Sequence, residues 1–579
     1  MSKIFKRFYQ FLFHYKKSFI AFALVLVVGT ILENLNPYFY KLLVDRIPGR
    51  NYQELLMILF LFIGVRISAN LLETLSYYLG DKVLIPASRD ARTTIFRHVQ
   101  DLDFAFHVNK NTGSLISAFK RGDGAFFDLF HQIHHNLVRI LISLLVVLFF
   151  FGRILPSIAG ILLVILAGNV LLGWRLVEYN MRKRTLFNEA EDRISGVITD
   201  NLINYETVKF FAQEEREEKR LKLEFKDWLI KLWNYANTFR LMDITIGSLS
   251  NLGVFLIFWL VIRDVAQGRV TAGDFVMVAT FIGEFYYQFF NVLYQSRNIA
   301  KSYVDIERYF SILDDEILVR DPAKPVKVKE VKGEIKFEKV SFSYPDSKEA
   351  VLKNFNLLIK PGASIAFIGR SGAGKTTLVR LLMRFYDVNQ GKITLDGVDI
   401  KNFSKIQLRS FIGIVPQEPI LFNNTIGYNI AYGKSQAPSS EVIKAAKAAN
   451  LHKFIDGLPL KYRTEVGERG IKLSGGQKQR LAIARMLLIN PKIIIFDEAT
   501  SNLDSESERL IQRSLWKMAK ERTVLIIAHR FSTTRKAEKI VVVDNGKIVE
   551  IGTHEDLVEK KKGIYQYLWQ LQAMGEMKK

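Results

Sequence analysis

The chain has 579 residues, enough for two to four domains of about 100 to 200 residues each. Its formal net charge of +23 favours an anionic partner, such as a phosphate ligand, a nucleic acid or a lipid headgroup. The chain has no cysteine, which excludes a disulfide framework, a thiolate metal site and a cysteine nucleophile. Mean hydropathy is slightly positive although 24% of the residues are charged, so apolar residues must be concentrated in part of the chain.

Six long apolar stretches occupy the first half of the chain. Each supplies about 20 residues, which at 1.5 Å rise per residue is the length of helix that crosses about 30 Å of hydrocarbon. A single stretch of this kind fits a buried core helix equally well, but six together predict a helical membrane domain. The stretches run over residues 18–40, 54–80, 136–153, 155–178, 241–263 and 274–294.

The residues ahead of the first stretch follow an amphipathic pattern. Lys3 and Arg7 lie on a polar side, and Phe5, Phe8 and Leu12 lie on the other side. This pattern predicts a helix in the membrane interface, with a mitochondrial presequence as the alternative. The first apolar stretch lacks a small-residue cleavage site and is followed by further stretches, so we expect it to remain in the mature protein.

Basic residues in the connections predict the orientation of the membrane domain. The N-terminus and the long connections at 81–135 and 179–240 are rich in Lys and Arg, which places these sides and both termini in the cytosol. We expect the plasma membrane of a bacterium. The outer connections are short, and the long cytosolic ones predict helices that continue well beyond the bilayer.

A charged, proline-containing stretch at 320–332 predicts a linker. It separates a membrane domain at 1–319 from a soluble domain at 333–579. Most of the excess positive charge lies in the soluble domain, where nucleotide or anionic headgroups explain it better than nucleic acid does.

A phosphate-binding loop is the clearest chemical motif. It follows a β-like run at 363–368 and precedes an apolar helical stretch at 378–383. Its glycines let backbone N–H groups converge on phosphate oxygens, Lys375 reaches the β and γ phosphates, and the Thr376 hydroxyl suits Mg²⁺. The predicted nucleotide-binding residues here are Gly369, Arg370, Ser371, Gly372, Ala373, Gly374, Lys375, Thr376 and Thr377.

Two carboxylates follow another β-like run, at 493–496. Ligands of open α/β sheets bind at the carboxyl ends of the strands, so Asp497 is predicted to bind Mg²⁺. Glu498 is then placed to orient or deprotonate the attacking water as a general base. An acidic helix cap after a buried strand is the alternative. His529 follows a third run, 523–528, and is predicted to contact the γ-phosphate, although such a histidine is often structural.

A second anion-binding segment, L-S-G-G-Q, precedes an apolar helix at 481–488. Serine and two glycines ahead of a helix present free N–H groups to an anion. One chain carries one phosphate loop and therefore has no second phosphate for this segment. We predict that a second subunit supplies it. The residues concerned are Ser474, Gly475, Gly476 and Gln477.

The order of these motifs, together with V-P-Q-E at 415–418 and S-N-L-D at 501–504, resembles the ATP-binding cassette of ABC transporters. With six preceding spans, nearly the whole chain resembles an ABC exporter half-transporter. The resemblance implies an α-helical membrane domain of six long transmembrane helices plus an α/β P-loop nucleotide-binding domain. It further implies ATP and Mg²⁺ as ligands, ATP hydrolysis coupled to export, and a domain-swapped homodimer or a pair with a closely related half-transporter.

The resemblance also implies roles for single residues. Tyr344 would stack on adenine, Gln417 would touch Mg²⁺ or the water, and Asp504 would join the nucleotide site. The L-S-G-G-Q segment would close over the γ-phosphate bound to the other subunit. Residues 464–470 would contact the cytosolic loops, whose tips at 112–123 and 203–211 would be coupling helices. Asn502 stands where the family commonly has alanine, beside the dimer seam.

A polar stripe on the sixth span is the candidate cargo site. Its members are spaced by four, three and four residues, so they share one helical face, which should contact protein or water because polar groups are costly in lipid. Polar packing between helices is the alternative. Arg66 is a further candidate, with an ion pair to Glu33 expected, and Asn169 and Asp243 are weaker ones. The stripe consists of Glu284, Gln288, Asn291 and Gln295.

Residues 204–211 and 424–433 and the T-G-S-L of the first loop look most like the half-transporters of glutathione-linked or heavy-metal-related compounds. Lipid flippases and multidrug exporters share most of these motifs and stay open as alternatives. An ATP-gated channel or a membrane-bound regulator is an alternative of another class, against which Glu498 and His529 speak. The expected partners are a second subunit, membrane lipid and an exported small molecule, with no nucleic acid.

Overall fold

The structure is a computed structural model, which describes residues 2–109, 112–345, 347, 349–467, 470–497, 512, 516, 519, 521–527 and 534–577. At residues 2, 109, 112–114, 292–298, 300 and 572–577 it describes the backbone alone. The chain divides into two compact units. The first is Met1–Gln100 with Thr112–Asp315, and the second is Asp101–Asn111 with Glu316–Lys579.

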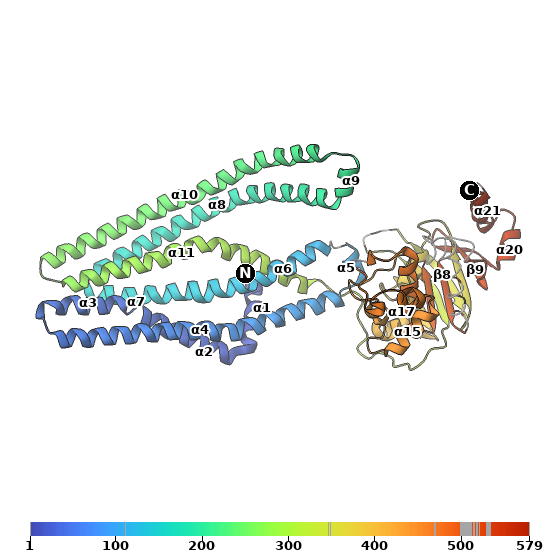
Figure 1. Ribbon diagram of the computed structural model, residues 1–579, viewed down its shortest axis with the longest axis horizontal. Coiled ribbons are helices and arrows are strands. Elements are labelled where there is room, and N and C mark those ends of the chain that lie inside the picture. The colour runs from blue at the N-terminus through green and yellow to red at the C-terminus, as the bar shows by residue number, and fades with distance from the viewer. Residues whose placement is uncertain are drawn as a thin grey trace. The chain divides into compact units, whose positions relative to one another are not determined.

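The first unit is helical (Figure 1). Each of the six predicted spans falls on helix. Five helical segments in the described part of the chain are long and apolar enough to cross a membrane, and the sixth span falls on α11, which has 40 residues. The helices are α1 (Ser2–Leu12), α2 (Lys16–Glu33), α3 (Asn36–Arg46), α4 (Tyr52–Asp101), α6 (Thr112–Phe130), the π-helical η3 (His131–Val138), α7 (Arg139–Ile154), α8 (Pro156–Ile203), α9 (Tyr205–Phe210), α10 (Glu214–Ala266) and α11 (Ala272–Ser311).

The long helices extend well past the thickness of a bilayer. Helix α4 has 50 residues and α10 has 53, so each is about 75 to 80 Å long against about 30 Å of hydrocarbon. Helices α8 and α10 run side by side as a hairpin whose tip is α9 (Figure 1). The predicted second tip, 203–211, is therefore correct.

The predicted first tip is wrong. Residues 112–123 lie inside α6, and the chain turns earlier, at the short helix α5 (Phe104–Asn109). The glycines at 113, 122 and 124 suggest a turn in the sequence, but Gly122 is there for close packing. It faces the ring of Tyr309 on α11, a side chain that is fully buried.

We expect the substitution Gly122→Ala to lower the melting temperature of the purified protein. An added Cβ would overlap the Cβ and Cγ atoms of Tyr309, which has no room to move aside. Overpacking of this kind costs about 1 to 3 kcal/mol. Gly124→Ala is the control, because its Cβ meets nothing within 4 Å and alanine favours helix by up to about 1 kcal/mol. Equal melting temperatures for the two variants would refute the packing argument.

Helix α1 is amphipathic as predicted, but its apolar face is covered by protein rather than lipid. Phe8 and Leu12 are completely buried, and the Phe8 ring lies 4.9 Å from that of Phe126. On the polar side Arg7 and Lys3 pair with Asp314 and lower the pKa of that carboxyl to about 2. Helix α1 is thus bound to the rest of the first unit through both of its faces.

The second unit contains two sheets. The antiparallel one has the order β2-β1-β4-β5, and the mostly parallel one has the order β10-β9-β3-β8-β7-β6. Its strands are β1 (Ile335–Phe342), β2 (Leu352–Ile359), β3 (Ser364–Ile368), β4 (Gln390–Leu395), β5 (Val398–Asp399), β6 (Ile412–Val415), β7 (Ile493–Asp497), β8 (Thr523–Ile527), β9 (Lys539–Asp544) and β10 (Lys547–Gly552). Its helices are α5, α12 (Lys375–Leu382), α13 (Lys405–Ser410), α14 (Ile426–Ala431), α15 (Ser439–Ala448), α16 (His452–Asp456), α17 (Gly475–Ile489), α20 (His554–Glu559) and α21 (Ile564–Met577).

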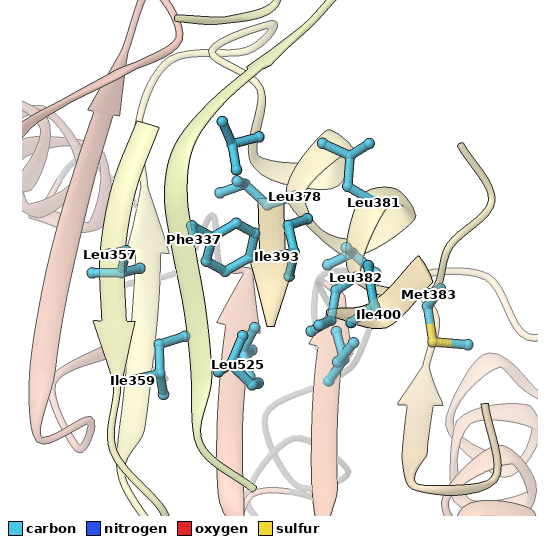
Figure 2. Close-up of a cluster of buried hydrophobic side chains, with 14 of the residues drawn as sticks. Phe337, Leu357, Ile359, Leu378, Leu381, Leu382, Met383, Ile393, Ile400 and Leu525 are labelled. Atoms are coloured by element: carbon cyan, nitrogen blue, oxygen red, sulfur yellow. The ribbon is translucent and has the colours of Figure 1, made fainter. Parts of the chain in front are cut away.

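Buried apolar side chains join the two sheets to helix α12. Phe337 from β1, Leu378 and Leu382 from α12 and Leu525 from β8 belong to one cluster (Figure 2). Strands β7 and β8 are covered on both faces, which is why their sequences are continuous apolar runs instead of alternating ones. This core fixes α12, and with it the phosphate-binding loop, against the parallel sheet.

The predicted linker is extended, and Arg384 and Gln407 of the second unit donate to its backbone carbonyl oxygens at Arg320 and Val328. The backbone N–H groups of Leu318 and Val319 donate to the Asp103 carboxylate beside α5. Within the linker itself, Val331 is buried in the core around α12. The ring of Phe104 on α5 stacks on Phe385 at 4.7 Å. Residues 103 and 104 therefore pack with the soluble half of the chain although they lie between two membrane helices.

Candidate nucleotide site

The phosphate-binding loop connects β3 to α12 as the sequence predicts. Gly372 and Gly374 adopt φ angles of +80° and +103°, which side chains other than glycine rarely adopt. Open space surrounds Gly372, whereas a Cβ at Gly369 would overlap the carbonyl oxygen of Val543. The loop backbone is thus held close to β9 on one side and is open to a ligand on the other.

Lys375, the first residue of α12, is 6% exposed. Its Nζ donates to the carbonyl oxygens of Gly369 at 2.8 Å and of Arg370 at 3.0 Å, so the ammonium group lies inside the loop. No described side chain caps the N-terminus of α12, which leaves its first N–H groups for an anion. Thr376 is exposed in the same turn. These residues fit a bound triphosphate, with the Thr376 hydroxyl available to Mg²⁺.

Strand register brings further predicted residues to the same edge of the sheet. Phe367 of β3 pairs with Ile527 of β8, and Asp497 of β7 pairs with the same residue. The ends of β3, β8 and β7 are therefore level, and Gln417 lies exposed just beyond the end of the neighbouring β6. The phosphate-binding loop, Asp497 and Gln417 all follow the carboxyl ends of adjacent strands, where ligands bind in such sheets.

Three predicted residues lie outside the described residues. Glu498 follows Asp497 directly, Asp504 comes six positions after Glu498, and His529 comes two positions after the end of β8. Asn502, beside the expected dimer seam, is also among them. Their assignments remain those of the sequence.

The L-S-G-G-Q segment begins helix α17 with a capping box. The Ser474 hydroxyl accepts from the backbone N–H of Gln477, and the Gln477 side chain accepts from the N–H of Ser474 at 2.9 Å. Ser474 and Gly475 are exposed, and Gly476 is buried. The Gln477 side chain is therefore used to form the helix end, and Ser474 and Gly475 make up its exposed surface.

Tyr344, the predicted adenine platform, follows β1 and is half-buried. Its hydroxyl lies 3.0 Å from the Thr377 hydroxyl, and Arg380 donates to it at 3.2 Å. Its ring packs edge-on against Tyr386 at 5.2 Å. The structure thus joins Tyr344 to the phosphate-loop helix through Thr377 and Arg380.

Arg380 contacts the predicted adenine platform, which the sequence patterns do not reveal. Its guanidinium lies 5.4 Å from the ring centroid of Phe104 on α5 and 6.0 Å from that of Tyr344. The only sequence signal is an arginine within the otherwise apolar run 378–383. Arg380 thus connects the predicted adenine platform with the turn between α4 and α6.

We expect Arg380→Ala to raise the KM for ATP about three- to tenfold and to change kcat much less. The substitution removes one donor and one cation–π contact that hold Tyr344 in place, each worth about 1 kcal/mol. Steady-state ATPase assays over a range of ATP concentrations would measure this. Arg463→Ala, at an exposed position of the same unit, is the control, and Arg380→Lys should recover part of the loss. A fall in kcat with unchanged KM would contradict a positioning role.

The structure shows the side chains of three of the four residues in the polar stripe of the sixth span. These three residues, Glu284, Gln288 and Asn291, line a cavity of about 400 Å³ in the membrane domain. The fourth residue, Gln295, is described by its backbone alone. Arg66 is exposed on α4 and does not line this cavity.

The expected Glu33–Arg66 ion pair is wrong. Arg139, at the start of α7, pairs with Glu33 on α2 and with Glu73 on α4.

The two weaker cargo-site candidates do not line the cavity. Asn169 is fully buried and donates to Ser250 across the α8–α10 hairpin, so it is a packing residue and not a cavity residue. Asp243 is exposed on α10.

Comparison with known proteins establishes the family. Residues 352–501 match the ABC transporter family and residues 19–289 match the ABC transporter transmembrane region. The chain belongs to the ABC transporters. This confirms both predicted halves of the chain. One is a helical membrane domain, and the other is an α/β nucleotide-binding domain with ATP and Mg²⁺ as its ligands.

The relatives of this ABC transporter include heavy-metal tolerance proteins. Heavy metal tolerance factor 1 of Caenorhabditis elegans is 34% identical over 96% of this chain and 70% of that protein. Human ATP-binding cassette sub-family B member 6 is 36% identical over 94% of this chain and 66% of that protein. The heavy metal tolerance protein of Schizosaccharomyces pombe is 36% identical over 85% of this chain but 59% of its own length. The predicted subfamily resemblance is confirmed.

A solved structure agrees with the whole architecture. The structure of a bacterial Atm1-family ABC exporter with ATP bound superposes with a TM-score of 0.84, at 33% identity, over 96% of this chain and 98% of that chain. The similarity extends over both halves of the chain, so the fold is that of an exporter whose membrane and ATP-binding domains share one polypeptide.

Proposed function

We propose that this chain is a half-transporter that uses ATP hydrolysis to export a glutathione- or metal-related compound from the cytosol. The proposal rests on one observation. The five candidate membrane spans and α11, which carries the sixth predicted span, are fused to a phosphate-loop domain in one chain that is similar over 96% of its length to heavy metal tolerance factor 1. Lipid flippases and multidrug exporters share this architecture, so the cargo class is a separate question for experiment.

Two copies of the chain would form the working unit. Each chain has one phosphate-binding loop and one exposed L-S-G-G-Q helix end, so Ser474, Gly475 and Gly476 of one copy would close over the γ-phosphate held by the other. A closely related half-transporter is the alternative partner. ATP would hold the two ATP-binding domains together, and hydrolysis would release them.

The residues proposed to hydrolyse ATP lie at or just after the ends of strands of the parallel sheet in the sequence, or lie in the phosphate-binding loop. Lys375 would bind the phosphates, while Thr376, Gln417 and Asp497 would hold Mg²⁺, which would neutralise phosphate charge. Glu498 would take the proton of the attacking water, and His529 would contact the γ-phosphate. Tyr205, Phe210 and Phe211 at the α9 tip are all exposed, and these side chains would receive the motion of the partner copy's ATP-binding domain.

The proposed location is a bacterial plasma membrane, with both termini in the cytosol, because the long Lys- and Arg-rich connections lie on that side. The functional division is a membrane domain at 1–319, a linker at 320–332 and an ATP-binding domain at 333–579. Attachment of a membrane-impermeant label to single cysteines, introduced at Arg50 in an outer turn and at Glu215 beside α9, would test this topology. Labelling of the second position from outside intact cells would overturn it.

Transport into sealed vesicles tests the function. Full-length protein is reconstituted with its ATP-binding domains outward, and uptake of oxidised glutathione and of a metal–glutathione complex is measured with and without ATP. We expect accumulation that requires ATP. Passive ion flux without ATP turnover would indicate a channel instead, and stimulation of the ATPase by lipids or drugs alone would move the assignment to a flippase or multidrug exporter.

A further inference from the structure

We propose that the cavity of about 400 Å³ in the membrane domain is a binding subsite for an organic ammonium group of the transported compound. This inference rests on the proposed function and specifies which part of the cargo the cavity holds. Four parts of the membrane domain line the cavity, namely the α2–α3 region, α4, the η3–α7 segment and α11. Glu284 lies 12 residues after the start of α11, about 18 Å along the helix, which is near the middle of the bilayer.

Charge at the cavity is unbalanced toward carboxylates. Glu33 and Glu284 line it together with Arg139, and Glu73 lies behind Arg139. The guanidinium of Arg139 is already shared between Glu33 and Glu73. Glu284 has no ion-pair partner among the described side chains. A carboxylate at this depth is costly without a counter-ion, and a cationic ligand would supply one.

The hydrogen-bonding groups also suit a donor. Three lining residues each have a buried side-chain atom that lacks a partner among the described residues, namely Asn36 Oδ1, His135 Nε2 and Gln288 Oε1. The two amide oxygens accept hydrogen bonds, and a neutral imidazole accepts through one ring nitrogen. A primary ammonium group offers three donors and no acceptor. It therefore matches both the charge and the unused acceptors.

Aromatic rings complete the lining. Tyr77 stacks on the imidazole of His135, with ring centroids 4.4 Å apart and planes within 8°. This stack holds His135 in place. Tyr287 lines the same cavity and is 71% exposed, so its ring is available to a ligand. The faces of tyrosine rings attract organic cations.

Other ligand classes fit less well. No group of three or more His, Asp or Glu side chains in the described part of the chain has the geometry to hold a metal ion. An anion would meet Glu33 and Glu284, with only the Arg139 guanidinium, which Glu73 also shares, in compensation. The geometry therefore points to a cargo that presents a protonated amine, which is a group that the γ-glutamyl end of a glutathione-related compound carries.

A matched pair of probes tests the subsite. S-hexylglutathione and its N-acetyl derivative differ at the amino group, which acetylation makes neutral. Their Kd values are measured by titration calorimetry on the full-length protein in lipid nanodiscs. Since hydrogen bonds to charged groups contribute about 1.5 to 3 kcal/mol, we expect the wild type to bind the free amine about tenfold more tightly or better. Glu284→Gln should reduce this ratio to less than twofold.

Control variants separate the subsite from general damage. Glu54→Gln changes a carboxylate at the outer end of α4 that pairs with Arg46 and does not line the cavity, so the full ratio should remain. Gln288→Met removes one acceptor and should lower the ratio to about threefold. If Glu284→Gln fails to fold, as judged by its melting curve, Gln288→Met decides the question, and an unchanged ratio there overturns the proposal.

Two further results would also overturn it. One is equal affinity of the wild type for the two probes, and the other is binding of Zn²⁺ alone that is lost in Glu284→Gln. Transport assays with the same pair keep this inference separate from the proposed function. ATP-driven uptake of both probes at equal rates and with equal affinity refutes the subsite and leaves the exporter intact. A tenfold binding ratio without ATP-driven uptake of either probe supports the subsite and refutes export.

Discussion

Substitution of Glu498 by glutamine is expected to lower ATP turnover at least about 100-fold while ATP binding persists, because loss of a general base typically costs 10² to 10⁴ in rate. Glu498 follows Asp497, which ends β7 level with the ends of β3 and β8 at the phosphate-binding loop. Glutamine keeps the size of the side chain and cannot take up the proton of the attacking water. Phosphate release at saturating ATP measures turnover, and binding of labelled ATP measures occupancy.

The result is specific if a carboxylate elsewhere in the same domain is dispensable. Glu559→Gln, at the exposed end of α20, should hydrolyse ATP like the wild type. Turnover of Glu498→Gln within about threefold of the wild type would show that another group is the base. Loss of ATP binding together with turnover would show instead that Glu498 supports the fold of the site.

A second large effect is expected for Arg139→Met. The guanidinium of Arg139 bridges Glu33 and Glu73, contacting Glu73 at 2.8 Å, and its own side chain is 21% exposed. Removal of one partner of a buried ion pair costs about 3 to 5 kcal/mol, and the partial exposure of both carboxylates reduces this to about 2 kcal/mol. We expect a melting temperature several degrees lower for the purified protein in lipid nanodiscs.

The triple variant Glu33→Gln, Glu73→Gln and Arg139→Met supplies the matched control. It removes all three charges of the bridge together, so neither position 33 nor position 73 keeps an unpaired carboxylate, and most of the lost stability should return. A triple variant no more stable than Arg139→Met alone would mean that the bridge itself stabilises the membrane domain. A single variant as stable as the wild type would mean that lipid or water compensates Glu33 and Glu73 fully.

The phosphate-binding loop and the strand end at Asp497 were predictable from the sequence because they depend on local order. A phosphate-binding loop requires a strand, glycines and a helix in succession, and all three are contiguous at 364–382. Asp497 was predicted from an apolar run that ends in an acid. Arg380 was not, because its role arises only where α12, Tyr344 and Phe104 meet.

The sequence by itself determined the class of protein, the number of spans, the order of the nucleotide-binding motifs and the tip at α9. The length of an apolar stretch and its helical periodicity are properties of one segment. They can therefore be recognised without knowing which segments meet. Only the tertiary structure decided that Glu33 pairs with Arg139 instead of Arg66, that the first turn lies at α5, and that α1 packs on protein. These contacts join segments that are distant in the chain, and such contacts depend on which helix faces are opposed, a property that no single segment carries.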